Sequence, residues 1–200
     1  GKNVFKGCTA LKTVTVPNGM TAIGYGMFED CTALVSADLP DSIIDIGAHA
    51  FEGCISLTNA IVPDSVVAIG DYAFYESAVK TAYIGHNVSD VGSYVFGRCS
   101  ALTEVTFTSG IETISEWMFY GCSSLTTIVD FPESVEVIGA HAFENCSALT
   151  GIVIPNTVEN ISDSAFAGCS VLANVELSTA LVNIGSNAFN GTAVKVIEIP

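Results

Sequence analysis

Phenylalanine recurs along the chain at an almost constant interval, and this periodicity limits what the sequence can fold into. Nine phenylalanines, 22 to 24 residues apart, form the series Phe5, Phe28, Phe51, Phe74, Phe96, Phe119, Phe143, Phe166 and Phe189. Only Phe107 and Phe131 fall outside this series. Seven of the nine are followed by a cysteine three residues later and by a leucine six residues later. Self-similarity at a fixed period is typical of a solenoid, in which each coil packs only on its neighbours.

The residues that follow each leucine predict a β-strand. Residues 11–16, 102–107 and 194–199 alternate apolar with polar side chains and are rich in β-branched types, which suits a strand buried on one face. Proline ends most of these segments, because it cannot donate to a continuing ladder. A shorter apolar pair follows, which predicts a second, short strand or a single turn. The sequence therefore predicts a β-solenoid of about nine coils, each with two straight runs and two corners.

Glycines and two irregularities mark the corners. Glycine precedes the phenylalanine in six coils, where a corner needs a positive φ or a close backbone approach: Gly24, Gly47, Gly70, Gly92, Gly139 and Gly185. At 77–79 and 192–194 the corner after the phenylalanine is one residue shorter and has lost its cysteine. Asp130 is one residue extra before Phe131, and we expect a bulge or a widened corner there.

Composition narrows the possible partners. Half of the residues are hydrophobic, yet no apolar run approaches the roughly 18 residues of a spanning helix, so we expect no membrane insertion. The net charge of -15 repels phosphate backbones, so we expect no binding to nucleic acid. The chain begins partway through a repeat and ends directly after a predicted strand. We therefore expect residues 1–200 to form a single solenoid from a longer protein, with its caps missing.

The repeat as a whole resembles a known family. The units GCTALKTVTVP, FEGCISLTNAIVPDSVVAIGDYAF and FENCSALTGIVIPNTVENISDSAF are similar to the surface-antigen, or BspA-like, type of leucine-rich repeat, and the resemblance covers the whole chain. It implies a curved parallel β-solenoid of the leucine-rich-repeat kind, with the long strands forming a concave sheet. It also implies a secreted or cell-surface protein, since members with a role are mostly adhesins that bind host matrix proteins or other cells. A shared repeat transfers the fold far better than the ligand.

The seven cysteines predict a ladder of free thiols. Disulfide-stapled small domains use irregular spacings and an even number of cysteines, whereas these occupy one position of successive coils. The sequence also lacks the CxxC pairs and clustered histidines of a zinc site. We expect buried thiols that pack as small hydrophobic side chains. Neighbouring coils bring their Cα atoms to roughly 5 Å, so disulfide bridging stays an alternative.

Two surfaces are candidate binding sites. On the concave face, outward strand positions form a column with an apolar middle and acidic ends, and the candidate ligand site at its middle comprises Asn59, Ile61, Thr81, Tyr83 and Thr106. At one corner, two residues before the phenylalanine, a candidate aromatic stripe for a glycan or protein comprises His49, Tyr72, Tyr94, Trp117 and His141. Both sets also have a structural interpretation, because β-branched residues favour strands and corner aromatic residues can pack on the next coil.

The sequence offers little support for catalysis. It contains no nucleophile elbow, phosphate-binding glycine loop or paired acid and base motif. His49 and His141 lie four coils apart, about 19 Å, too far to share a metal. We expect no enzyme, cofactor or metal site. The leading hypothesis is a binding module of a cell-surface or secreted adhesin, whose concave sheet recognises a protein or glycan; the alternative is a passive spacer or stalk. The ligand and the oligomeric state stay open.

Overall fold

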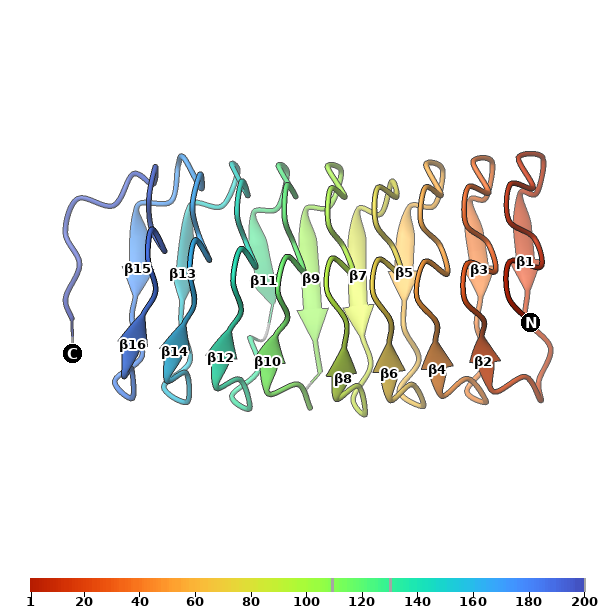
Figure 1. Ribbon diagram of the computed structural model, residues 1–200, viewed down its shortest axis with the longest axis horizontal. Helices are drawn as coiled ribbons and strands as arrows, with labels where there is room; N and C mark the ends of the chain where they lie inside the picture. Colours follow the sequence, from red (N-terminus) through yellow and green to blue (C-terminus); the bar gives the residue numbers. More distant parts are fainter. Residues whose placement is uncertain (109, 130, 200) are drawn as a thin grey trace.

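The protein is a single row of stacked coils. The computed structural model describes residues 1–108, 110–129 and 131–199. Figure 1 shows the coils side by side, with the two termini at opposite ends of the row. The described part of the chain contains no α-helix, and therefore none that could cross a membrane.

Each of eight coils contributes one long and one short strand among the described residues. The long strands are β1 (Thr13–Thr15), β3 (Ser36–Asp38), β5 (Asn59–Ile61), β7 (Thr81–Ile84), β9 (Glu104–Phe107), β11 (Thr127–Val129), β13 (Gly151–Val153) and β15 (Asn174–Glu176). The short strands are β2 (Ala22–Ile23), β4 (Asp45–Ile46), β6 (Ala68–Ile69), β8 (Asp90–Val91), β10 (Thr113–Ile114), β12 (Val137–Ile138), β14 (Asn160–Ile161) and β16 (Asn183–Ile184). Strands pair in parallel with those of the same kind in neighbouring coils. The predicted parallel β-solenoid is confirmed.

The ninth coil lacks the strand that its sequence predicts. Residues 194–199 have an alternating pattern, yet they form no strand. A strand needs a hydrogen-bonded partner, and within the described residues β15 pairs only with β13. The expected number of about nine coils is therefore slightly too high for the strands, although the ninth phenylalanine, Phe189, still stacks on Phe166.

The phenylalanine series forms one continuous stack of rings inside the coils. Successive ring centroids are 5.2 to 5.8 Å apart, and neighbouring planes are within 17° of parallel. The rings from Phe28 to Phe166 are buried, whereas Phe5 is 42% exposed. From Phe5 to Phe166, the amide of each phenylalanine donates to the carbonyl oxygen just before the next one, at 2.7 to 2.9 Å. Ring burial and this amide ladder together fix the spacing of the coils.

Two corner positions in each coil have left-handed backbone, and they are not the predicted glycines. The residues two before and two after the phenylalanine have positive φ, as in His49 (59°), Trp117 (59°) and Gly53 (68°). The predicted corner glycines, such as Gly47 and Gly139, do not have positive φ. A Cβ added at Gly47 would lie 2.9 Å from a backbone oxygen of the preceding coil, and one added at Gly139 would lie 2.7 Å from the equivalent oxygen. Close approach between coils is therefore the reason for these glycines.

The cysteines form the predicted ladder of free thiols. Six are buried and Cys8, in the first coil, is exposed. Each buried thiol donates a hydrogen bond to the carbonyl oxygen of the preceding coil's phenylalanine, as from Cys54 to Phe28 at 3.2 Å. Burial raises the pKa of Cys54 to about 12 and that of Cys99 to about 11. The thiols are therefore hydrogen-bond donors as well as small apolar side chains.

A hydroxyl replaces the thiol in the two shortened corners. Ser77 and Thr192 occupy the position three residues after the phenylalanine, where the other coils have cysteine. Ser77 is buried, and its oxygen lies 3.3 Å from the sulfur of Cys99 in the next coil. The hydroxyl of Thr192 donates to the carbonyl oxygen of Phe189. Neither of these contacts reaches the carbonyl oxygen of the preceding coil's phenylalanine, which the thiols use in the other coils. The missing residue lies further along the corner.

The long strands do not form one continuous sheet. Pairing runs β1-β3, then β11-β9-β7-β5, then β13-β15, and Figure 1 shows wider spacings at these two breaks. The second break follows the extra residue Asp130, which lies outside the described residues, as does the bulge expected there. The short strands keep their register past this point, since Val137 pairs with both Thr113 and Asn160. The additional length is therefore absorbed on the long-strand side of the coils.

We expect the substitution Phe119→Ala to lower the free energy of unfolding by about 3 to 5 kcal/mol, because it leaves a cavity between two buried rings. The control is Phe5→Ala, whose ring is partly exposed at the end of the stack and should cost less than half as much. Chemical denaturation followed by circular dichroism measures both losses. Equal losses would show that burial within the stack is not the source of the stabilisation.

In the folded protein we expect one thiol, Cys8, to react rapidly with a disulfide reagent at pH 8, and the other six to react only after unfolding. The thiolate is the reactive form, and burial disfavours it. The variant Cys8→Ser should abolish the rapid phase, and a rapid phase of more than one thiol would refute the buried ladder. Because the folded pKa values lie above the ordinary value of 9.0, the stabilisation from neutral thiols is complete below pH 9 and decreases as the pH rises towards 11 to 12.

Candidate functional site

The five residues predicted as a ligand site lie together on three neighbouring strands. Across β5 and β7, Asn59 pairs with Thr81 and Ile61 with Tyr83, and Tyr83 also pairs with Thr106 on β9. Ile61 is 67% exposed, while Tyr83 and Thr106 are half-buried. We call the outward side of the long strands the long-strand face. It is the face predicted to be concave. Strand alternation places all five side chains on it.

Hydrogen bonds fix the orientation of the polar members of this site. The hydroxyl of Thr81 donates to the side-chain oxygen of Asn59 at 2.9 Å. The hydroxyl of Tyr83 donates to Oδ1 of Asp64 at 3.3 Å, and the same oxygen accepts the backbone amide of His86 at 2.9 Å. Side chains that are already held lose less conformational entropy when a partner binds. The middle of the long-strand face is therefore a preorganised surface.

The strand register adds three residues that the predicted site left out. Glu104 pairs with both Thr81 and Thr127, and Val129 pairs with Thr106. Glu104 and Thr127 continue the row of Asn59 and Thr81, and Val129 continues the row of Ile61, Tyr83 and Thr106. The repeat pattern is enough to predict which residues share a row, but it does not predict the strand at which the row ends. The continuous four-stranded part of the long-strand face stops at β11.

The predicted aromatic stripe is a stack of rings along one corner. The rings of Tyr25, His49, Tyr72, Tyr94, Trp117 and His141 follow one another with centroid distances of 3.7 to 5.2 Å. Tyr25 was not predicted as a member, because Gly26 occupies the aligned position in that coil and the ring comes from the residue before it. We call these six residues the corner stack.

A second row of aromatic residues supports the corner stack from its edge. Tyr75 and Tyr120 each pack edge-on against two of its rings, with centroid distances of 5.1 to 6.3 Å. Both directly follow the phenylalanine of their coils, a position that the sequence analysis did not consider. Desolvation raises the pKa of Tyr75 and of Tyr94 within this packing.

The corner stack leaves few ring faces for a ligand. Each ring from His49 to Trp117 has another ring on both sides. A sugar that stacks on an aromatic side chain uses the face of the ring, which these neighbours cover. The geometry therefore favours the structural interpretation of the stripe over a role in stacking glycans.

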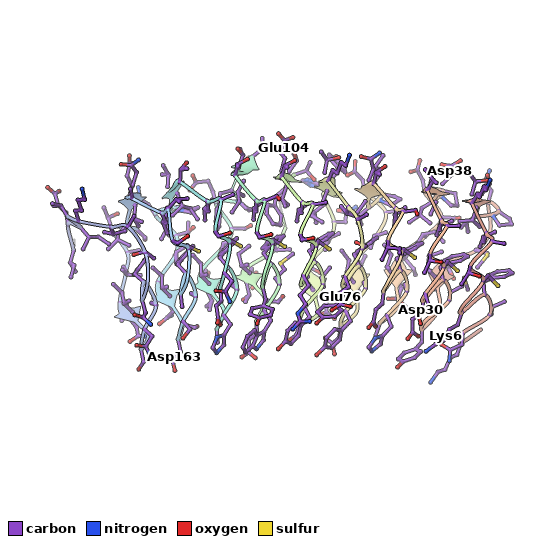
Figure 2. All side chains as sticks on the ribbon, turned by 90° about the horizontal axis from the view of Figure 1, so that it is seen from above. Lys6, Asp30, Asp38, Glu76, Glu104 and Asp163 are labelled. Atoms are coloured by element: carbon purple, nitrogen blue, oxygen red, sulfur yellow. The ribbon has the colours of Figure 1, made fainter. Side chains whose placement is uncertain are left out.

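The two candidate surfaces lie on opposite sides of the row. In Figure 2, Asp38 and Glu104 of the long strands point from one side, whereas Asp30, Glu76 and Asp163, from the corners that carry the stack, point from the other. A single small ligand cannot contact both surfaces.

Ionisable side chains do not gather into a metal site among the described residues. No group of three or more histidines, cysteines, aspartates or glutamates is placed to hold a metal ion there. His49 and His141 each contact the glutamate three residues later, Glu52 and Glu144, and each ring stacks on its neighbours. Both histidines thus take part in the packing of the corner.

Comparison with protein families identifies the repeat. The model of the BspA type leucine-rich repeat region matches residues 1–103 and 89–200, with six copies. Among curated proteins, no match was found.

Solved structures agree with this assignment. A leucine-rich repeat protein from Bacteroides ovatus is 34% identical, with a TM-score of 0.87 over 94% of this chain and 49% of that protein. A leucine-rich repeat protein from T. pallidum is 30% identical, with a TM-score of 0.70 over 74% of this chain and 69% of the T. pallidum chain. The pneumococcal vaccine antigen PcpA, 17% identical, shares the fold with a TM-score of 0.55 over 95% of this chain and 61% of its own. The chain thus spans about half the length of the Bacteroides ovatus protein. Its repeat, its coil geometry and these similarities agree: the chain belongs to the BspA type of leucine-rich repeat proteins.

Proposed function

We propose that this chain is a non-catalytic binding module of a cell-surface or secreted adhesin, which recognises a host or cell-surface protein or glycan through the long-strand face. The observation that carries the proposal is the row formed by Ile61, Tyr83, Thr106 and Val129, held in register on one four-stranded sheet. It combines the exposed Ile61 and the half-buried Tyr83 and Val129 with polar neighbours on a rigid backbone, as protein contact sites do.

The family supports the surface location in this proposal. Repeats of this type form extended faces suited to binding. One solved structure with the same fold, PcpA, is described as a vaccine antigen, which fits exposure on a cell. The two histidines of the corner stack, His49 and His141, contact Glu52 and Glu144 and pack against neighbouring rings, which supports a role in packing rather than in catalysis.

A passive spacer or stalk is the alternative, and the phenylalanine stack favours it in one respect. An unbroken stack of rings from Phe5 to Phe189 would keep the row stiff whether or not its faces bind anything. The two functions differ in their sensitivity to surface substitutions, because a spacer needs only the core.

We expect Ile61→Glu and Tyr83→Glu each to weaken binding at least tenfold, because each places a charge in the apolar centre of the contact surface. The measurement is surface plasmon resonance against a panel of extracellular-matrix proteins, with a glycan array run in parallel. Both variants should keep the circular dichroism spectrum of the unmodified protein, since Ile61 is exposed and Tyr83 is half-buried.

The matched control is Ile44→Glu, which introduces the same charge at an isoleucine that is 52% exposed next to the short strand β4. This variant should bind like the unmodified protein. Equal weakening in all three variants would point to the added charge itself rather than to the long-strand face. A folded protein that binds nothing in the panel would favour the spacer.

A further inference from the structure

The second break in the long-strand sheet opens a groove. Between β11 and β13 lies a cavity of about 500 Å³, whose apolar lining includes Ile128, Phe131, Ile152 and Val153. A cavity of this volume is in the range of sites that hold a ligand group. It lies just beyond Val129, the last residue of the row that begins at Ile61 on the long-strand face.

Two sequence features distinguish the coils that line the groove. The first is the extra residue before Phe131. Phe131 aligns with Phe107 of the preceding coil, but Phe107 is buried whereas Phe131 is only half-buried. Gly151, the first residue of β13, contributes no side chain to the groove that it lines. Within the described residues, β11 pairs only with β9 and β13 only with β15. No strand of the described residues therefore pairs with the facing edges of β11 and β13.

The charges around the groove all have one sign. Its charged lining residues among those described are Glu133 and Glu176, both exposed, and neither lysine nor arginine lines it. The chain as a whole carries a net charge of -15. An acidic rim around an apolar floor attracts a cationic group beside an apolar one and repels an acidic segment.

We propose that this groove binds an extended peptide segment of a protein partner, with a bulky apolar side chain in the groove and lysine or arginine next to it. Open strand edges are the surfaces on which extended peptides add to a sheet. The apolar floor selects the central side chain, and Glu133 and Glu176 select the flanking charges. This inference rests on the proposed function, because it names the kind of partner that the long-strand face takes.

The test is selection of a displayed library of random twelve-residue peptides on the immobilised protein. We expect enriched peptides to carry an aromatic or large aliphatic residue with lysine or arginine within two positions. In the double variant Glu133→Lys/Glu176→Lys, the affinity of these peptides, measured by isothermal titration calorimetry, should fall at least tenfold. A fresh selection on this variant should enrich acidic flanks instead. Replacing the large apolar residue of an enriched peptide by alanine should also weaken its binding at least tenfold.

The matched control is Glu112→Lys/Glu136→Lys, which makes the same change in net charge at exposed residues beside the short strands of the same region. Peptides should bind this variant within a factor of two of the unmodified protein. Failure to enrich any peptide, or equal weakening in both double variants, would overturn the groove as a peptide site. Binding of a matrix protein that depends on Tyr83 would still support the proposed function in that case, so the two failures are distinguishable.

Discussion

The stack of phenylalanine rings, with the amide ladder beside it, is the interaction on which the rest of the structure depends. Every ring from Phe28 to Phe166 is buried between two others, and the amide hydrogen bonds that join successive coils beside the rings are all 2.7 to 2.9 Å long. This corner over-determines the backbone, so it can hold non-glycine residues such as His49 and Trp117 in left-handed conformations that would otherwise be unfavourable. The buried thiols donate instead to the carbonyl oxygens of the phenylalanines themselves, and so add a second set of hydrogen bonds between the same coils.

A rigid corner determines where the coils can vary. Because the phenylalanine ladder passes from Phe119 to Phe143 without a change in spacing, the additional residue between them has to be accommodated elsewhere. The short strands also keep their register there, which leaves the long-strand side as the place where the sheet opens. The long-strand sheet is thus continuous from β5 to β11, and a groove lies at its end. On the opposite side of the row, the rings of the corner stack contact one another from coil to coil and help to keep the coils evenly spaced.

Much of this architecture could be predicted from the sequence, because residues that repeat in the core report the packing directly. The interval between phenylalanines predicted the coils, and alternation predicted that Ile61 and Tyr83 share one face. Other features depend on contacts between coils that a repeat pattern does not contain: Tyr25 joins the corner stack from a neighbouring position, and Gly47 is required by the approach of another coil. The breaks in the sheet could not be located, since a one-residue change in length does not show which side of a coil absorbs it. The ligand is also beyond the pattern, because exposed positions are not constrained by packing.

Amide hydrogen exchange, followed residue by residue by nuclear magnetic resonance, tests most directly the claim that the corner is continuous while the long-strand sheet is broken. The amides of Phe119 and Phe143 should exchange as slowly as those of Phe51 and Phe96, because their ladder is unbroken. The amides of β13 that point towards β11 should exchange at least a hundredfold faster than the amides of β15 that point towards β13, because only the latter have a paired strand. Equal protection of the two sets would contradict the account, since it would mean that the sheet is closed and the groove absent.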